Sequence, residues 1–136
     1  MLTERQLNRY ADVLLWGLQT AKSRRIARND MVLVRFDLAA IRLAEILFAK
    51  LLEAGAHPLL RLNPTAAMER DFYTLSNNKQ LVYIPPGEET LFTRLNGSIS
   101  IFAPESITHL AQIDPKRIAK AALSKKALRD LLDKRE

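Results

Sequence analysis

Strand-like and helix-like segments alternate along the 136-residue chain, and this alternation restricts its fold more than any other feature. The β-branched run MVLVRF at 31–36 is followed by an amphipathic segment that ends at Gly55, and then by a second apolar run, HPLLRLN, at 57–63. Strands joined through a helix are typical of parallel sheets, because a parallel connection must cross over the sheet. The sequence therefore predicts an α/β fold of three layers, with a mainly parallel sheet of about four strands and helices on both faces.

The other two strands are expected at QLVYI, residues 80–84, and at SISIF, residues 98–102. Helices are expected before each of them, at 65–75 and 88–95, and Gly97 is expected to end the second helix. With these segments the alternation continues along most of the chain, which favours a single domain over residues 1–136.

A further helix is expected near each end of the chain. Thr3, with a glutamine three residues later, has the spacing of a capping box ahead of a helix that runs to about Lys22. The Asp-Pro pair at 114–115 is a typical helix start, and we expect a bend near Ser124 before a closing helix over 126–134. The closing helix has a narrow face of leucines, so we expect it to rest on the flank of the sheet or on a neighbouring copy.

Composition excludes several classes of protein. The chain has no cysteine, which excludes disulfides, thiolate zinc sites, iron–sulfur clusters and a cysteine nucleophile. Its apolar runs are too short for a membrane span, which needs about 20 residues, and the first residues lack the features of a signal peptide. We therefore expect a cytoplasmic protein that does not insert into a membrane.

The net charge of +6 could suggest a nucleic-acid partner, but its distribution favours another interpretation. Residues 1–30 carry six Lys or Arg against three acids, and 114–136 carry eight against four, whereas 31–113 are almost balanced with seven against eight. The excess lies on the expected end helices, and aromatic residues do not alternate with the basic ones as a stacking surface requires. We expect solvated helix faces and no nucleic-acid site.

Sequence motifs for phosphate binding and nucleophilic catalysis are absent. The four glycines are too dispersed for a dinucleotide-binding or P-loop motif, and no serine lies in a G-x-S-x-G motif. His57 and His109 belong to no cluster with metal-ligand spacing. His57 begins its strand at the amino end of the expected sheet, where a structural role is expected.

The carboxyl ends of the expected strands define the candidate site, because ligands of open parallel sheets bind at that edge. The residues that follow the strands are Asp37, Asn63, Pro85-Pro86 and 102–105, and His109 lies shortly after the last of them. Asp37 is also expected to cap the helix that follows the first strand. The candidate binding residues of this rim are therefore Asp37, Asn63 and His109, with no catalytic or metal-ligating residue among them.

Arg35 and Arg61 are additional candidates, because each lies near the carboxyl end of an otherwise apolar strand. A buried arginine needs a carboxylate or a set of carbonyl groups. One interpretation is an edge position or an internal ion pair, with Asp37 as one possible partner. The other is a binding site for an anion or a protein partner.

Four segments of the chain resemble the N-terminal domain of the thermophilic metalloaminopeptidase family, of the aminopeptidase S and aminopeptidase T type. They are YADVLLWGLQTAK, the stretch from DMVLVRF to HPLLRL, NGSISIFAPES, and IDPKRIAKAALSKKALRDLLDKRE. The resemblance consists of diffuse patterns in the same order and covers essentially the whole chain. One departure is Asn29, where members of the family often have a glycine before the aspartate.

The resemblance implies a function that the residues alone do not. Members of the family are dimeric, two-domain aminopeptidases, and a C-terminal domain holds two divalent metal ions, of the zinc or cobalt type, on Glu, His, Tyr and Asp. This chain would then be a non-catalytic N-terminal domain without a cofactor of its own, and the native chain is expected to continue past Glu136. Its expected partners are its own catalytic domain, a peptide substrate and a second copy. The alternative is a stand-alone α/β binding module for an anionic small molecule or a protein partner.

Overall fold

The computed structural model describes residues 2–103 and 109–133. Its elements are, in chain order, α1 (Glu4–Lys22), β1 (Met31–Phe36), the short 3-10 helix η1 (Leu38–Ala40), α2 (Ile41–Glu53), β2 (His57–Leu62), α3 (Ala66–Leu75), α4 (Asn78–Leu81), α5 (Glu88–Arg94), β3 (Gly97–Ile101), α6 (Pro115–Ser124) and α7 (Lys126–Asp133). The predicted α/β class and its three layers are confirmed, but the sheet has three strands and not four.

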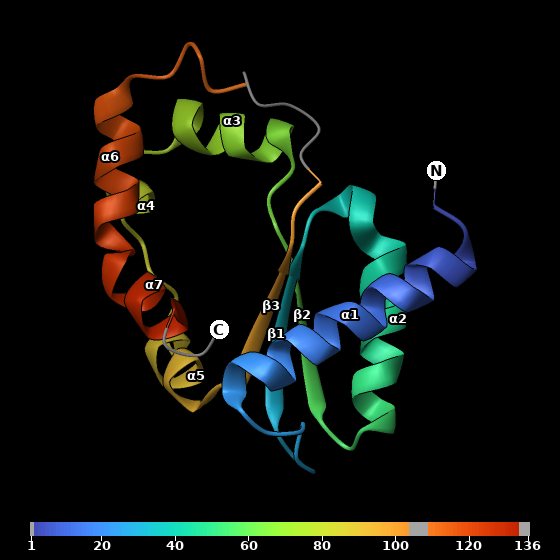
Figure 1. Ribbon diagram of the computed structural model, residues 1–136. Coiled ribbons are helices and arrows are strands. Elements are labelled where there is room, and N and C mark those ends of the chain that lie inside the picture. The colour runs from blue at the N-terminus through green and yellow to red at the C-terminus, as the bar shows by residue number, and fades with distance from the viewer. Residues whose placement is uncertain (1, 104–108, 134–136) are drawn as a thin grey trace.

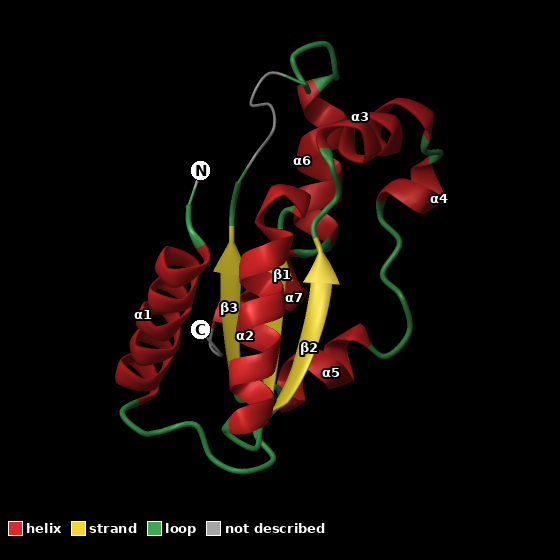
Figure 2. Ribbon diagram, turned by 90° about the vertical axis from the view of Figure 1, so that its right-hand side faces the viewer, coloured by secondary structure: helices red, strands yellow, loops and turns green. Residues whose placement is uncertain are grey.

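The sheet is parallel, with β1 in the centre and the order β2-β1-β3. The register pairs Arg35 of β1 with Arg61 on one side and with Ser100 on the other. Because all three strands point the same way, their carboxyl ends meet at one edge, which faces α3 in Figure 2.

Helices α1 and α2 cover the first face of the sheet, as Figure 1 shows. Alternate residues of β1 enter this core, which also takes apolar side chains from both helices and from β3. Its central members are Val32, Val34, Ala44, Leu47 and Leu51, each almost completely buried. This core follows from the helical periodicity that the sequence shows.

The second face of the sheet packs against α5 and α7 at its lower end in Figure 1. Leu33 of β1 is fully buried there against Phe92 and Leu95 from the α5 region and Leu132 from α7. The closing helix therefore rests on the chain's own sheet and α5, which is one of the two surfaces expected for it.

The predicted strand at 80–84 is wrong. Asn77 begins the short helix α4 instead: its side chain accepts from Gln80 N (2.8 Å), and the Gln80 side chain accepts from Asn77 N (2.9 Å). Leu81 is buried, whereas Tyr83 is 60% exposed and the chain continues without regular structure toward α5. The capping box at Asn77 competes with the apolar run that follows it, and the local helix forms.

Gly97 does not end a helix as predicted, but is the first residue of β3. A Cβ atom at this position would lie 3.0 Å from Leu18 Cδ1 of α1, closer than side-chain atoms normally approach. A larger residue at this position would require the Leu18 side chain to shift, so the glycine favours the close approach of α1 to the sheet.

The local signals at the helix ends are otherwise confirmed. Thr3 and Gln6 form the predicted capping box, Asn29 has a left-handed backbone (φ 69°), and Asp114 accepts from Lys116 N at the start of α6. The helix is interrupted at Lys125, which separates α6 from α7 and is next to the predicted bend. Arg5, a neighbour of the first cap, is exposed.

Helices α3 and α6 form a layer beyond the carboxyl edge of the sheet (Figure 2). Arg117 of α6 joins them, because its Nε donates to Tyr73 O (3.0 Å) and its Nη2 to Ser76 O (2.6 Å) at the end of α3. These bonds satisfy carbonyl groups that the last turn of a helix leaves open. Within the described residues, no helix is long and apolar enough to cross a membrane.

Candidate functional site

Asp37 connects the carboxyl ends of all three strands. It directly follows β1, its Oδ1 accepts from Asn63 Nδ2 (3.0 Å) after β2, and its Oδ2 accepts from Ala103 N (2.6 Å) after β3. The predicted helix cap is wrong, because the side chain makes no capping bond to η1. These charge-assisted hydrogen bonds fix the segments after β2 and β3 relative to the end of β1.

A cavity of about 330 Å³ opens beside Asp37 at this edge. Asn63 and Phe102 line it from the strand ends, and Thr65 and Glu69 line it from α3. This is the position at which open parallel sheets bind ligands. Of the other predicted rim segments, Pro85-Pro86 follows no strand and does not line this cavity, and residues 104–105 lie outside the described residues.

His109 lines the same cavity and contacts α3. Its Nε2 lies 2.6 Å from Glu69 Oε1, and its Nδ1 is buried without a hydrogen-bond partner among the described residues. Glu69 is not among the residues that the sequence predicts for this site. Its position in the first turn of α3 is a weak signal, since acidic residues there are common for the helix dipole alone.

Arg61 does not reach the rim cavity. Its two terminal nitrogens donate to both carboxylate oxygens of Glu88 on α5 (2.8 and 2.6 Å), and its guanidinium lies 5.7 Å from the centre of the Phe92 ring. The hydrogen bonds to Glu88 raise the pKa of Arg61 above its ordinary value. The structure therefore supports the internal ion pair, with Glu88 and not Asp37 as the partner.

Arg35 also lies away from the rim cavity. Its Nη2 donates to Ser100 Oγ (3.1 Å) on the neighbouring strand β3. It shares the second face of the sheet with Leu33, two residues earlier, because side chains alternate along a strand. The five predicted residues thus form two groups, with Asp37, Asn63 and His109 at the rim and the two arginines on the second face.

The rim does not fit a metal centre. Over residues 2–103 and 109–133, no three His, Asp or Glu side chains come together as a metal site requires. Asp37 accepts a hydrogen bond from Asn63, and Glu69 contacts His109. The two carboxylates of the rim therefore have different partners.

Residues 3–136 match the family described as thermophilic metalloprotease (M29). The fold is similar to that of wild-type AmpT from Thermus thermophilus, with a TM-score of 0.65 and 16% sequence identity. The likeness covers 96% of this chain, which spans only 32% of that structure. No curated protein matches the chain.

Proposed function

The chain belongs to the thermophilic metalloprotease family M29, and from this we propose that it serves as the non-catalytic N-terminal domain of a metal-dependent aminopeptidase. The parent enzyme would remove N-terminal residues from peptides. The match to the family extends over almost the whole chain, whereas the chain corresponds to about a third (32%) of AmpT.

One observation carries this proposal. The family is one of metalloproteases, yet the described residues contain no group of three metal donors. In the proposed parent, residues outside this chain hold the two divalent metal ions, of the zinc or cobalt type, that activate water and polarise the peptide carbonyl. The domain described here would shape access to that site or support assembly.

The outer side of α1 supports a role in assembly. Tyr10, Val13 and Trp16 recur at helical spacing and are all at least half exposed, with Trp16 at 65%. Large apolar side chains gathered on one exposed surface mark sites of protein contact. We assign this apolar stripe to contact with the catalytic domain, and we propose a cytoplasmic homodimer for the parent.

The proposal is tested with the purified 136-residue chain. We expect no hydrolysis of a leucyl reporter peptide and no tight binding of zinc or cobalt in calorimetry, because the described donors do not form a metal site. An active aminopeptidase in the same assay serves as the control. Turnover by the isolated chain would overturn the proposal.

The reading frame separates this function from the alternative, a stand-alone α/β binding module. A continuation past Glu136 with clustered Glu, His, Tyr and Asp residues supports the peptidase domain. A stop codon directly after Glu136, in a genome that encodes no separate catalytic chain, supports the binding module.

A further inference from the structure

A second cavity lies on the face of the sheet opposite α1 and α2. Its volume is about 540 Å³, and it extends from β1 to α5, α6 and α7. Its apolar walls include Phe72, Phe92, Leu128 and Leu132. Leu132 also belongs to the buried contact between α7 and the sheet, so the cavity continues the core of this face.

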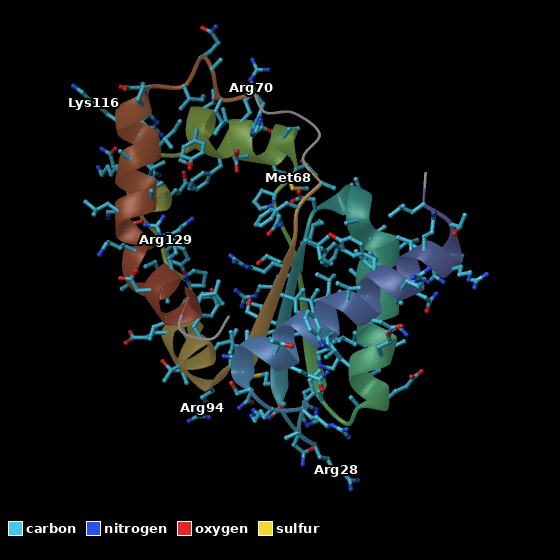
Figure 3. All side chains as sticks on the ribbon, viewed as in Figure 1. Arg28, Met68, Arg70, Arg94, Lys116 and Arg129 are labelled. Carbon is cyan, nitrogen blue, oxygen red and sulfur yellow. The ribbon has the colours of Figure 1, made fainter. Side chains whose placement is uncertain are left out.

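Three cationic side chains from three places in the chain line this cavity: Arg35 of β1, Lys125 between α6 and α7, and Arg129 of α7. Arg35 is held by its bond to Ser100, and Lys125 Nζ lies 5.2 Å from the centre of the Phe72 ring. Lys125 and Arg129 are exposed and therefore lie at the open side of the cavity. Arg129 is labelled in Figure 3.

The lining contains one carboxylate, Glu88, among the described residues. Both of its oxygens accept from Arg61, which lies behind it on β2. Glu88 is thus already paired with Arg61, so it does not balance the charges of Lys125 and Arg129. The rim cavity has the opposite character, because Asp37 and Glu69 line it and no lysine or arginine does among the residues that the structure describes.

We propose that this basic cavity binds a small molecule that carries a phosphate or carboxylate group on an apolar body. An oxyanion between Lys125 and Arg129 makes charge-assisted hydrogen bonds, and arginine matches the planar geometry of such groups. The apolar body of the ligand lies against Phe72, Phe92 and Leu128, which form an apolar wall of the cavity. The inference does not depend on the proposed peptidase function.

The test uses phenyl phosphate and benzoate as probes, with benzyl alcohol as the neutral probe of similar shape. Each is titrated into the isotope-labelled 136-residue chain, and amide chemical shifts are followed by NMR. We expect saturable shifts for the anionic probes at Leu128, Arg129 and Phe92, with dissociation constants on the order of 1 mM. Benzyl alcohol should give no saturable shift. The tighter of the two anionic probes identifies the head group.

Charge-removing variants locate the binding. Lys125→Gln and Arg129→Gln should each weaken binding of the preferred probe about tenfold, because each removes one charge-assisted contact. Lys116→Gln is the matched control, since Lys116 lies at the start of α6 and does not line the cavity (Figure 3). It should leave the affinity unchanged, and thermal unfolding should be similar in all three variants.

Three outcomes would overturn the proposal: no saturable shift for either anionic probe, shifts confined to α1 or to the rim cavity, or equal affinities in wild type and in the Lys125 and Arg129 variants. Peptidase activity enters none of these measurements. Failure of the ligand site is therefore distinguishable from failure of the proposed function.

Discussion

At the scale of single residues, Asp37 and Asp30 show how a carboxylate organises backbone. Asp37 bonds the ends of the two outer strands through Asn63 and Ala103. Asp30, in the turn before β1, accepts from Arg24 (2.8 Å) and from Ala27 N (2.8 Å). These hydrogen bonds fix the segments that follow β2 and β3 and the turn before β1, which lie outside the helices and strands.

We expect Asp37→Ala to lower the free energy of unfolding by about 2 kcal/mol, because it leaves the Ala103 amide and the Asn63 amide group without an acceptor. Urea unfolding measures the change. Asp12→Ala is the control, since Asp12 is 63% exposed and pairs with Lys50 at the surface. Its effect should be at most about 0.5 kcal/mol. Equal effects of the two substitutions would contradict the role of Asp37.

Asp30 should make the fold sensitive to acid. The hydrogen bonds from Arg24 hold the pKa of Asp30 below its ordinary value, so the folded chain keeps this carboxylate charged at a pH where the unfolded chain takes up a proton. Stability is therefore present above about pH 4 and is lost as the pH falls through the folded-state pKa.

Urea unfolding over a series of acidic pH values checks this prediction. Asp30→Asn and Arg24→Gln should both reduce the part of the stability that is lost below about pH 4. The first removes the titrating group, and the second removes the main cause of its lowered pKa. Acid profiles identical to that of the wild type would show that another group dominates.

At the scale of elements, α7 is too short to be stable alone and depends on packing. Its leucine face contacts α5 and the second face of the sheet, and Leu132 is only 2% exposed. The same helix carries Arg129 to the basic cavity. Packing of one leucine thus positions one of the cations of the proposed site.

Leu132→Ala should lower the free energy of unfolding by about 3 kcal/mol, because it opens a cavity between α7, Leu33 and Phe92. Leu123→Ala in α6 is the matched control. That leucine is 73% exposed, so its loss should cost at most about 0.5 kcal/mol. Calorimetric melting of the two variants makes the comparison. A Leu132 variant as stable as the control would mean that α7 does not belong to the core.

At the scale of the whole molecule, much of the positive charge is used within the fold. Arg117 binds carbonyl groups of α3, and Arg61 binds Glu88. Other basic side chains form surface pairs: Arg24 with Asp30, Arg42 with Glu4, and Lys50 with Asp12. Cationic side chains of several elements are therefore already paired within the described part of the chain.

We expect no specific complex with nucleic acid. Fluorescence anisotropy with a labelled duplex should give a dissociation constant weaker than about 10 μM at about 0.15 M salt, with no preference between sequences. A duplex of scrambled sequence serves as the control. A sequence-selective, sub-micromolar complex would contradict this prediction and would assign the basic end helices to a nucleic-acid surface.

Local signals in the sequence determined most of the elements of this protein. The apolar run at 31–36, the capping box at Thr3 and the Asp-Pro start of α6 depend on neighbours within a few residues, and all three form as predicted. The wrong prediction at 80–84 also has a local cause, because the sequence contains both the capping box at Asn77 and the apolar run after it, and the two favour different structures.

Only the tertiary structure decided which side chains meet. Arg61 and its partner Glu88 are 27 residues apart, and His109 and Glu69 are 40 residues apart. Nothing in the local spacing of such residues indicates a partner, because the contact exists only after the strands and helices have packed. The same holds for the basic cavity, whose cations come from β1 and from the α6–α7 region, and which forms only where α7 packs on the sheet.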